Sequence, residues 1–536
     1  MRKTVKQPWE QWYAEGMSSL LLPEISVYTL LDQSAKEFPN HTAIIFEDHL
    51  MDYKSLKSQV DKLAGKWKEM GFVKGERIGL MMANHPYFII SYYAAQALGL
   101  IVVQLNPMYK PRELLQILVD SNAPYIVYDQ LAATTIEETK AIYDFSICMK
   151  TDDDQLDGLS LRSLIESGEE IKEVETINPL EDIAVIQYTG GTTGKMKGAM
   201  LTHYNLTSNV IQSSEMYGDL MVPGKEVVLA ATPLYHVYAM TSAMNLGIYI
   251  GAAILLFPKF EIQNVLMNIQ KYRPTFFPGV PKMYNAFVNH PEIEKYGLDC
   301  LKNCSCGSAP MPVEVINRFE KLTGASIGEG FGLSEASPST HRNPPLGKRK
   351  IGSVGIPFPR TDCMIVDEDN NEVPSKGVGE LLIKGPQIMK GYWNNEVETR
   401  KALQNGWLYT GDLASVDEEG YFYIVGRKKE MIIISGFNIY PQEVEGVLYQ
   451  HPDIQEAAVV GIPHKELGEV VKAFIVPKKD ANIDLEEIEG YCYTQLTPYK
   501  VPKQFEVREE LPRNTVGKLL KRLLIKEELE KRTKKD

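Results

Sequence analysis

The sequence predicts an α/β protein with a large N-terminal domain built from several subdomains and a small α+β C-terminal domain. From about Ser26 onward, helical patterns alternate with short β-rich runs, which is typical of parallel sheets covered by helices. The 536 residues exceed what a single hydrophobic core organises. After Gly379 the pattern changes to short strands separated by glycine turns. Together these observations predict two domains.

The elements follow from the apolar patterns in chain order. The strands expected in the N-terminal domain are 42–46, 77–83, 100–105, 183–188, 252–257 and 274–279. The later part is expected to contain strands 380–385, 420–426 and 431–436, helix 441–450, strands 456–462 and 471–477, and helix 485–496. We place the N-terminal domain at 1–426, a polar connection at 427–429, and the C-terminal domain at 430–536.

Composition argues against several classes of protein. The chain has 57 basic and 70 acidic side chains, a net charge of −13, which argues against a broad nucleic-acid-binding face. Six unevenly spaced cysteines do not form a disulfide framework, so reduced thiols are expected. A metal site at Cys300, Cys304 and Cys306 is the alternative. No CxxC or histidine pair completes such a site, so buried structural thiols are favoured.

Two long stretches without charge, 78–109 and 233–258, raise the alternative of a membrane span. The first separates into strand, helix and strand, and the second into a helix with polar residues followed by a strand. The N-terminus has no apolar core of signal-peptide length. We therefore expect a cytoplasmic protein. Peripheral membrane contact by the Lys/Glu-rich tail 525–536 is a minor alternative.

A loop rich in glycine and threonine follows the expected strand 183–188 and predicts a phosphate-binding cradle. Glycine permits backbone conformations in which successive N–H groups face an anion, while hydroxyls and ammonium groups add donors. It is not a Walker loop, because Thr189 and Met196 stand where that pattern needs glycine and a hydroxyl residue. A flexible surface turn is the alternative. The expected phosphate ligands are Thr189, Gly190, Gly191, Thr192, Thr193, Gly194, Lys195 and Lys197.

The segment EGFGLSEASP, residues 329–338, is a second signal for nucleotide binding. Glu335 lies beside a glycine–aromatic–glycine turn. Phe331 could stack on a purine, and the Glu335 carboxylate could hold Mg²⁺. A carboxylate that merely caps a helix beginning near Ser334 is the alternative.

Two further motifs lie in the last third of the chain. In WLYTGD, residues 407–412, Asp412 could accept hydrogen bonds from both hydroxyls of a ribose, and Arg427 could add a donor fork to the same sugar. In LPRNTVGKLLKR, Lys518 follows a threonine–glycine turn from which an ammonium could reach a phosphate. Ordinary surface charges are the alternative for each of these residues.

In this order the motifs resemble the adenylate-forming superfamily of acyl-CoA synthetases, luciferases and peptide-synthetase adenylation domains. The resemblance covers roughly residues 27–524. The chain looks most similar to bacterial long-chain fatty acid CoA ligases, through the segments YTGGTTG, PLYHVYAMT, FFPGVPKMY, GSAPMP, FGLSEASP and KGPQIMKGYW. The resemblance implies the adenylate-forming fold, in which a small mobile C-terminal domain carries a catalytic lysine.

The resemblance also implies roles for individual residues. The glycine-rich loop would grip the β- and γ-phosphates of ATP, Glu335 would bind Mg²⁺, and Asp412 with Arg427 would hold the ribose. Lys518 would contact the attacking carboxylate and the α-phosphate, stabilising charge that develops in the transition state. The residues implied at the adenine and acyl site and in the turn after it are Gly307, Ser308, Gly330, Phe331, Gly332 and Ser334.

A movement between two half-reactions is also implied. After adenylation the small domain would rotate at the hinge residue Lys429, removing Lys518 and bringing the loop at Ser435 and Gly436 toward CoA. His236, in PLYHVYAM, would lie near the carboxylate and acyl pocket. A hydrogen-bonded core histidine is the alternative for His236.

Three positions depart from the family pattern. Met196 replaces the usual proline of the phosphate loop, Phe331 replaces the commoner tyrosine, and Ser334 replaces the commoner threonine. The first change loosens the free loop by about 0.5 to 1 kcal/mol without removing a ligand. None of the three changes the implied class of activity.

The sequence thus predicts an enzyme that uses ATP, Mg²⁺ and CoA to convert a long-chain fatty acid to its CoA thioester. A medium-chain or aromatic, coumarate-like acid is the alternative substrate. A nucleotide-binding regulatory protein without turnover and a module that transfers to a carrier protein are two further alternatives. The patterns leave open whether the protein is a monomer or a homodimer.

Overall fold

The computed structural model describes residues 7–151, 158–190, 196–345, 347–434, 437–464, 467–479, 481, 483–513 and 518–533. The chain divides into two units, unit 1 with Met1–Cys363 and Ile383–Leu408, and unit 2 with Met364–Leu382 and Tyr409–Asp536. The divisions fall within three strands, β17 (Asp362–Val366), β18 (Gly379–Lys384) and β21 (Trp407–Val416). A hinge is defined by movement, so the hinge expected at 427–429 stays a prediction.

The first sheet of unit 1 has nine strands in the order β16-β15-β14-β13-β12-β10-β11-β1-β2. The strands from β14 to β1 run parallel, and antiparallel strands close both edges. Their bounds are β1 (Thr42–Phe46), β2 (His49–Asp52), β10 (Val227–Ala230), β11 (Ala253–Leu256), β12 (Phe276–Gly279), β13 (Asn303–Cys306), β14 (Ser326–Gly332), β15 (Ser339–Arg342) and β16 (Ile356–Pro357).

The second sheet of unit 1 has eight strands in the order β19-β9-β8-β4-β3-β5-β6-β7. All pairings from β8 to β7 are parallel, and β9 and β19 add an antiparallel edge. The bounds are β3 (Arg77–Met81), β4 (Ile101–Gln104), β5 (Tyr125–Tyr128), β6 (Ile147–Lys150), β7 (Leu159–Ser160), β8 (Ile183–Gly190), β9 (Met196–Thr202) and β19 (Gly391–Tyr392). The short strand β20 (Leu403–Gln404) pairs with the start of β21.

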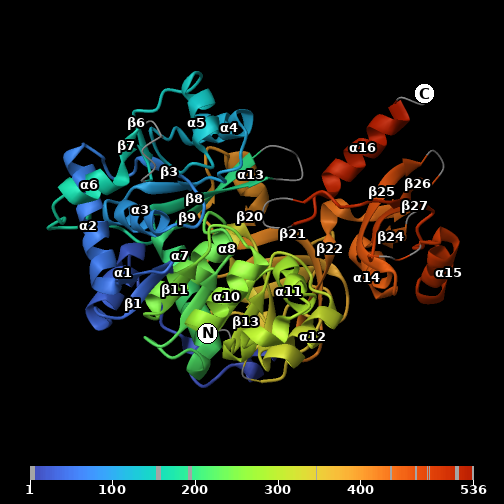
Figure 1. Ribbon diagram of the computed structural model, residues 1–536. Helices are drawn as coiled ribbons and strands as arrows, with labels where there is room; N and C mark the ends of the chain where they lie inside the picture. Colours follow the sequence, from blue (N-terminus) through green and yellow to red (C-terminus); the bar gives the residue numbers. More distant parts are fainter. Residues whose placement is uncertain are drawn as a thin grey trace, which may run out of the picture. The chain divides into compact units, whose positions relative to one another are not determined.

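Helices cover these sheets and fill the space between them. Figure 1 shows α10, α11 and α12 beside β13, where their apolar faces bury Val265, Phe287 and Phe319 against the first sheet. The helices of unit 1 are α1 (Val27–Glu37), α2 (Tyr53–Glu69), α3 (Pro86–Ala97), α4 (Pro111–Ser121), α5 (Ala133–Lys140), α6 (Leu161–Ser167), α7 (His203–Tyr217), α8 (Val237–Ala239), α9 (Leu246–Tyr249), α10 (Ile262–Tyr272), α11 (Pro281–Val288), α12 (Val313–Thr323) and α13 (Glu396–Ala402).

The largest core joins the two sheets of unit 1. It contains Ile44 and Val228 from the first sheet, Val102 and Val185 from the second, and apolar side chains of α1, α3 and α7. Helix α3 is buried along nearly its whole length, so its apolar sequence reflects a position inside the protein. The stretch 78–109 therefore forms the expected strand, helix and strand. Among the described residues, no helix is long and apolar enough to cross a membrane.

The stretch 233–258 contains α8, a π-helical segment η4 (Met240–Asn245), α9 and β11. This agrees with the predicted buried helix and strand. The six cysteines are all free thiols, as expected. In the part of the chain that the structure describes, no group of three or more His, Cys, Asp or Glu side chains is arranged to hold a metal ion. Cys300, Cys304 and Cys306 are buried, which agrees with the predicted structural thiols.

Unit 2 contains a five-stranded sheet with the order β24-β23-β26-β25, to which β27 adds beside β26. Figure 1 labels β24, β25, β26 and β27 together with α14, α15 and α16 in the orange and red part of the chain. The bounds are β22 (Phe422–Arg427), β23 (Ile432–Ile434), β24 (Phe437–Ile439), β25 (Ile454–His464), β26 (Gly468–Pro477), β27 (Gln504–Val507), α14 (Pro441–Gln450), α15 (Leu485–Gln495) and α16 (Lys521–Thr533). The helices and strands expected for this part of the chain are confirmed.

A partly buried ion network attaches the last helix to this sheet. Lys472 of β26 lies 2.7 Å from Glu506 of β27 and 2.8 Å from Glu528 of α16. Lys531 pairs with the same two carboxylates at 2.9 and 2.8 Å. Burial raises the pKa of Glu506, but hydrogen bonds from Lys472 and Lys531 outweigh burial and lower the pKa to about 2. Burial also raises the pKa of Glu528, and hydrogen bonds from the same two lysines outweigh burial and lower the pKa.

We predict that acid loosens α16 before other helices of unit 2. A carboxylate whose pKa is lower in the folded state contributes stability above its unfolded pKa of about 4.3 and loses it as the pH falls toward the folded value. For Glu506 this interval extends from about 4.3 down to about 2. Hydrogen exchange measured at several pH values should show α16 losing protection at higher pH than α15. Equal loss of protection in both helices would contradict a special role for the network.

Candidate active site

The hairpin of β8 and β9 frames the glycine-rich loop. Thr189 lies opposite Lys197 and Gly190 opposite Met196 in this antiparallel pair, so both ends of the predicted cradle are fixed by strand pairing. Thr189 is half-buried. The remaining predicted ligands Gly191, Thr192, Thr193, Gly194 and Lys195 lie outside the described residues, and their role stays a prediction.

Lys197 is held by a carboxylate that the sequence did not point to. Its ammonium forms an ion pair with Glu398 of α13 and lies 5.0 Å from the ring centroid of Tyr392. Hydrogen bonds from Lys197 and then Lys401 lower the pKa of Glu398 to about 2. Glu398 therefore stays charged at neutral pH and keeps Lys197 oriented along the hairpin.

A short strand connects the hairpin with Glu335. In β19, Tyr392 pairs with Ala199 of β9, and its hydroxyl donates a hydrogen bond of 2.7 Å to Glu335 Oε1. The backbone carbonyl of Glu335 accepts a second bond of 2.8 Å from the Met389 amide. The structure thus brings the predicted Mg²⁺ ligand and the base of the predicted phosphate loop together.

Glu335 lies within a single 3₁₀ turn, Ser334–Ala336, that follows β14. Leu333 is the N-cap residue of this turn, so Glu335 does not occupy the capping position that the alternative interpretation required. Ser334 and Glu335 are both half-buried. The turn is held from the other side by Thr241, whose hydroxyl donates to the Ser337 carbonyl at 2.8 Å.

The predicted adenine segment forms the end of β14. Gly330 lies opposite Arg342 and Phe331 opposite His341 on β15, and the Phe331 and His341 rings lie 6.0 Å apart, centroid to centroid. Gly332 is exposed to solvent but closely approached by backbone, because a Cβ atom there would lie 2.3 Å from the Pro338 carbonyl oxygen. A side chain at position 332 would therefore force the two strands apart.

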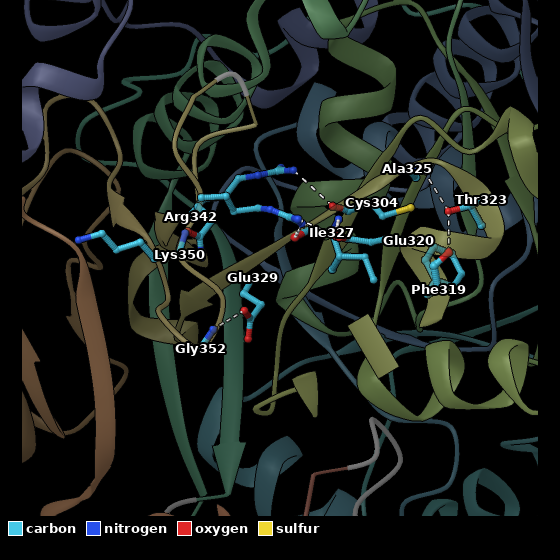
Figure 2. Close-up of polar contacts among 12 residues, drawn as sticks. Cys304, Phe319, Glu320, Thr323, Ala325, Ile327, Glu329, Arg342, Lys350 and Gly352 are labelled. Atoms are coloured by element: carbon cyan, nitrogen blue, oxygen red, sulfur yellow. Dashed lines mark hydrogen bonds and ion pairs between the residues drawn. The ribbon is translucent and has the colours of Figure 1, made fainter. Parts of the chain in front are cut away.

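Arg342, on the neighbouring strand β15, is an unusual buried cation. Arg342 is 6% exposed, its guanidinium carbon lies 3.7 Å from the Tyr217 ring centroid, and burial lowers its pKa to about 9. Figure 2 shows Arg342 reaching toward the carbonyl oxygen of Cys304, to which it donates a long bond of 3.5 Å. The ring of Tyr217 offers a cation–π contact in place of a carboxylate. No sequence motif indicated this residue.

A carboxylate near the start of the same segment is also partly buried. Glu329 accepts a hydrogen bond of 2.9 Å from the Gly352 amide, a contact that Figure 2 shows as a dashed line. Burial raises the pKa of Glu329. This bond joins β14 to the chain that leads into β16, which stabilises the segment expected to contact adenine.

The segment PLYHVYAM places His236 at the start of α8. His236 Nδ1 accepts a hydrogen bond of 3.2 Å from the Tyr238 amide, which in a neutral imidazole leaves the proton on Nε2. Tyr238 shares a hydrogen bond of 2.9 Å with Ser305 Oγ. A Cβ atom at Gly307 would lie at an ordinary contact distance of 3.4 Å from the Tyr238 ring. His236, Tyr238 and Gly307 therefore lie in one neighbourhood, with Ser308 exposed beside Gly307.

The remaining predicted residues belong to unit 2. Asp412 is 3% exposed, and its Oδ1 lies 3.1 Å from Arg427 Nε, since the two residues are opposite each other on β21 and β22. Lys429 and Lys518 are exposed. Ser435 and Gly436 lie outside the described residues. Asp412 and Arg427 are therefore close enough to contact the same ligand, and their role in binding a ribose stays a prediction.

The strand–loop hairpin, the adjacent carboxylate and the glycine-rich end of a parallel strand define a nucleotide-binding α/β protein. Residues 31–393 match the AMP-binding enzyme family, and residues 443–518 match the AMP-binding enzyme C-terminal domain. The chain belongs to the AMP-binding enzyme family. The family resemblance and the adenylate-forming fold predicted from the motifs are confirmed.

Curated relatives and solved structures match over nearly the full chain. A long-chain-fatty-acid–CoA ligase of Bacillus subtilis is 40% identical over 98% of this chain and 99% of its own length. One from Escherichia coli O6:H1 is 38% identical over 97% and 98%. The crystal structure of an anthranilate CoA ligase in complex with anthranoyl-AMP has a TM-score of 0.89 at 27% identity and covers 96% of this chain and 99% of its own.

We predict that Gly332→Ala destabilises unit 1 whereas Gly307→Ala has a much smaller effect. The Cβ at position 332 would overlap the Pro338 carbonyl oxygen, while the one at position 307 meets Tyr238 at ordinary contact distance. An overlap that forces the backbone to shift typically costs about 1–3 kcal/mol. Thermal unfolding of the two variants measures the difference. Similar melting temperatures for both would show that the Pro338 backbone does not restrict position 332.

Proposed function

We propose that this protein is an ATP-dependent ligase that activates a long-chain fatty acid as acyl-AMP, releases pyrophosphate, and transfers the acyl group to CoA. The observation that carries the proposal is the hydrogen bond from Tyr392 to Glu335, which joins the glycine-rich hairpin to the carboxylate expected to bind Mg²⁺. The relatives named long-chain-fatty-acid–CoA ligases support the substrate class.

The hairpin binds the β- and γ-phosphates of ATP through Thr189, Lys197 and the loop between them. One carboxylate, Glu335, suits Mg²⁺, which proteins commonly bind through one or two carboxylates together with phosphate oxygens. The ion would neutralise charge on the phosphates. Gly330 and Phe331 offer a flat strand end on which adenine stacks, and Asp412 with Arg427 holds the ribose hydroxyls.

Lys518 contacts the attacking carboxylate and the α-phosphate during adenylation. Its exposed position leaves the ammonium able to enter and leave a site. Rotation at Lys429 then withdraws Lys518 and brings the loop at Ser435 and Gly436 toward CoA, so that one site serves both half-reactions. His236 lies close to the acyl carboxylate and donates from Nε2, the nitrogen left protonated by the contact with Tyr238.

The preference for a long acyl chain is explained by burial of its apolar surface. Eight additional methylene groups contribute up to about 6 kcal/mol when buried, so the depth of an acyl tunnel is enough to select long chains. The rival interpretation is a medium-chain or aromatic acid, and the similarity to an anthranilate CoA ligase is the observation that favours it. The protein is proposed to act in the cytoplasm on these small molecules, as a monomer or homodimer, with peripheral membrane contact as an option.

The substrate class is tested by pyrophosphate release from purified protein with ATP and Mg²⁺. Acids from acetate to oleate, and coumarate, are compared with and without CoA. We expect CoA-dependent turnover to be highest with long-chain acids, because each added methylene contributes about 0.8 kcal/mol of binding. A maximum with coumarate would establish the aromatic rival, and transfer only to a carrier protein would exclude free CoA. No turnover with any acid would support the regulatory alternative.

Replacing Lys518 separates the two half-reactions. Lys518→Ala should slow pyrophosphate release by about 100-fold or more, the usual cost of losing a group that stabilises transition-state charge. Thioester formation from supplied acyl-AMP should remain within a few-fold of the unaltered protein. Equal loss in both assays would exclude the assigned role, and Lys521→Ala tests whether any lysine of this segment has the same effect.

Stiffening the predicted hinge should affect the other half-reaction, thioester formation. Lys429→Pro fixes one backbone dihedral and should leave adenylation intact while it blocks thioester formation. Lys429→Ala serves as the control, because it removes the side chain and keeps backbone freedom. Unimpaired CoA transfer in Lys429→Pro would remove the hinge from the mechanism.

A further inference from the structure

Three adjacent strands of the eight-stranded sheet present amide side chains at their carboxyl ends. Asn84 follows β3, Gln104 ends β4, and Gln187 lies in β8, and the order β8-β4-β3 makes these strands neighbours. All three side chains are buried. We call Asn84, Gln104 and Gln187 the amide row. Its members direct their amide groups to one segment, residues 230–240, which leaves strand β10 of the other sheet of unit 1 and carries His236.

The Asn84 carboxamide makes three hydrogen bonds, all to the backbone of this segment. Its Nδ2 donates to the carbonyl oxygens of Ala230 and Thr232 at 3.1 and 3.0 Å, and its Oδ1 accepts from the Leu234 amide at 2.7 Å. These three bonds determine the path of the backbone between the end of β10 and His236. The opposite side is fixed by the Thr232 hydroxyl, which donates to the Pro278 carbonyl at 3.1 Å.

The two glutamines grip the next part of the segment. Gln187 Nε2 donates to the Tyr235 carbonyl at 3.4 Å, and Gln104 Nε2 lies 3.1 Å from Met240 Sδ. No donor among the described residues reaches the Oε1 atom of either glutamine. A buried acceptor without a partner is unfavourable and rare. Gln104 and Gln187 are opposite each other on paired strands, and in both the described contacts are made by the NH₂ group. We infer that these two side chains act as hydrogen-bond donors to the segment.

The gripped segment ends in a fixed imidazole. Tyr235 immediately precedes His236, the His236 amide donates to the Pro233 carbonyl at 3.1 Å, and Nδ1 accepts from Tyr238. Backbone and ring are therefore set by one continuous set of hydrogen bonds that begins at Asn84. A displacement of the backbone at 230–234 would be transmitted to the ring of His236.

We propose that Asn84 is a positioning residue for His236, assisted by Gln187 and Gln104. In this role Asn84 acts through the backbone of the segment and not through contact with substrate. It sets the backbone from which His236 Nε2 faces the acyl carboxylate, and this assignment rests on the proposed function. Small displacements of a reacting group slow an enzyme far more than they weaken binding, so the effect belongs in kcat.

The test is a double-mutant cycle with acyl-adenylate formation as the readout. Asn84→Ala should lower kcat by about 10- to 100-fold, with KM for ATP changed by less than about two-fold. In a His236→Ala background, the same replacement should change kcat by less than about two-fold, because residues that act through one another are not additive. Multiplicative losses in the double variant would overturn the proposal.

Asn303→Ala is the matched control. Asn303 is a buried amide at the amino end of β13 that donates to the Leu220 carbonyl at 2.8 Å, so its loss also removes a buried hydrogen bond. Asn303→Ala removes one side-chain hydrogen bond where Asn84→Ala removes three, so it should destabilise the protein less, while kcat stays near the unaltered value. Should Asn84→Ala fail to fold, Asn84→Asp retains the acceptor for Leu234, and Gln187→Met keeps the volume but not the donor to Tyr235. Both should lower kcat, and unchanged kcat in both would overturn the proposal.

A second readout does not depend on turnover. With ¹⁵N-labelled histidine, the chain's nine histidines report their tautomers, and the signals missing in His236→Ala identify His236. Asn84→Ala should shift these signals and Asn303→Ala should not. Unchanged His236 signals in Asn84→Ala would overturn the positioning role even if no acid were activated and the proposed function had failed.

Discussion

The hydrogen bonds of Asn84 link the two sheets of unit 1 at the ends of their strands. The main constraint on unit 1 is that loops from two separate sheets must lie next to one another. The residue follows a strand of the eight-stranded sheet and binds the backbone that leaves β10 of the nine-stranded sheet. Loops collect at the carboxyl ends of parallel strands, where ligands of open α/β sheets bind. The glycine-rich hairpin after β8, Glu335 after β14 and His236 after β10 all leave such ends. Their convergence follows from this topology and from the apolar core that joins the two sheets, and the hydrogen bonds of Asn84 add a polar link between them.

The interior near these loops is unusually polar, and the polarity is only partly satisfied. Arg342 is buried without a carboxylate and stacks on Tyr217, while Gln104 and Gln187 keep acceptors that no described donor reaches. An unsatisfied buried polar group costs about 1–3 kcal/mol, and the large core shared by the two sheets is able to offset costs of this size. Buried polar atoms without a described partner also occur on α3 and α7, at Ser91, Gln96 and Ser208, so this kind of cost is spread through unit 1.

The sequence predicted the fold well because its signals are local. Periodicity identified β1, β3, β4, β8, β11 and β12, and both uncharged stretches resolved into strands and helices as expected. Motif residues such as Glu335 were found because their neighbours are distinctive. Glu398, Arg342 and Asn84 were missed, since each acts through a partner far away in the chain: Lys197, Tyr217 and the segment after β10. Tyr392 stood inside a recognised motif, yet only the pairing of β19 with β9 shows that it binds Glu335.

The pairing of Lys197 with Glu398 is compatible with the proposed phosphate contact. Their side chains are 17% and 27% exposed, so the attraction is screened, and such pairs contribute at most about 1 kcal/mol. A phosphate carries more charge and accepts stronger, charge-assisted hydrogen bonds, and would therefore displace the carboxylate from Lys197. Glu398 would then keep its second partner, Lys401 at 2.8 Å. Neither charge would then be left buried and alone, so exchange of partners at the base of the hairpin would have a small energetic cost.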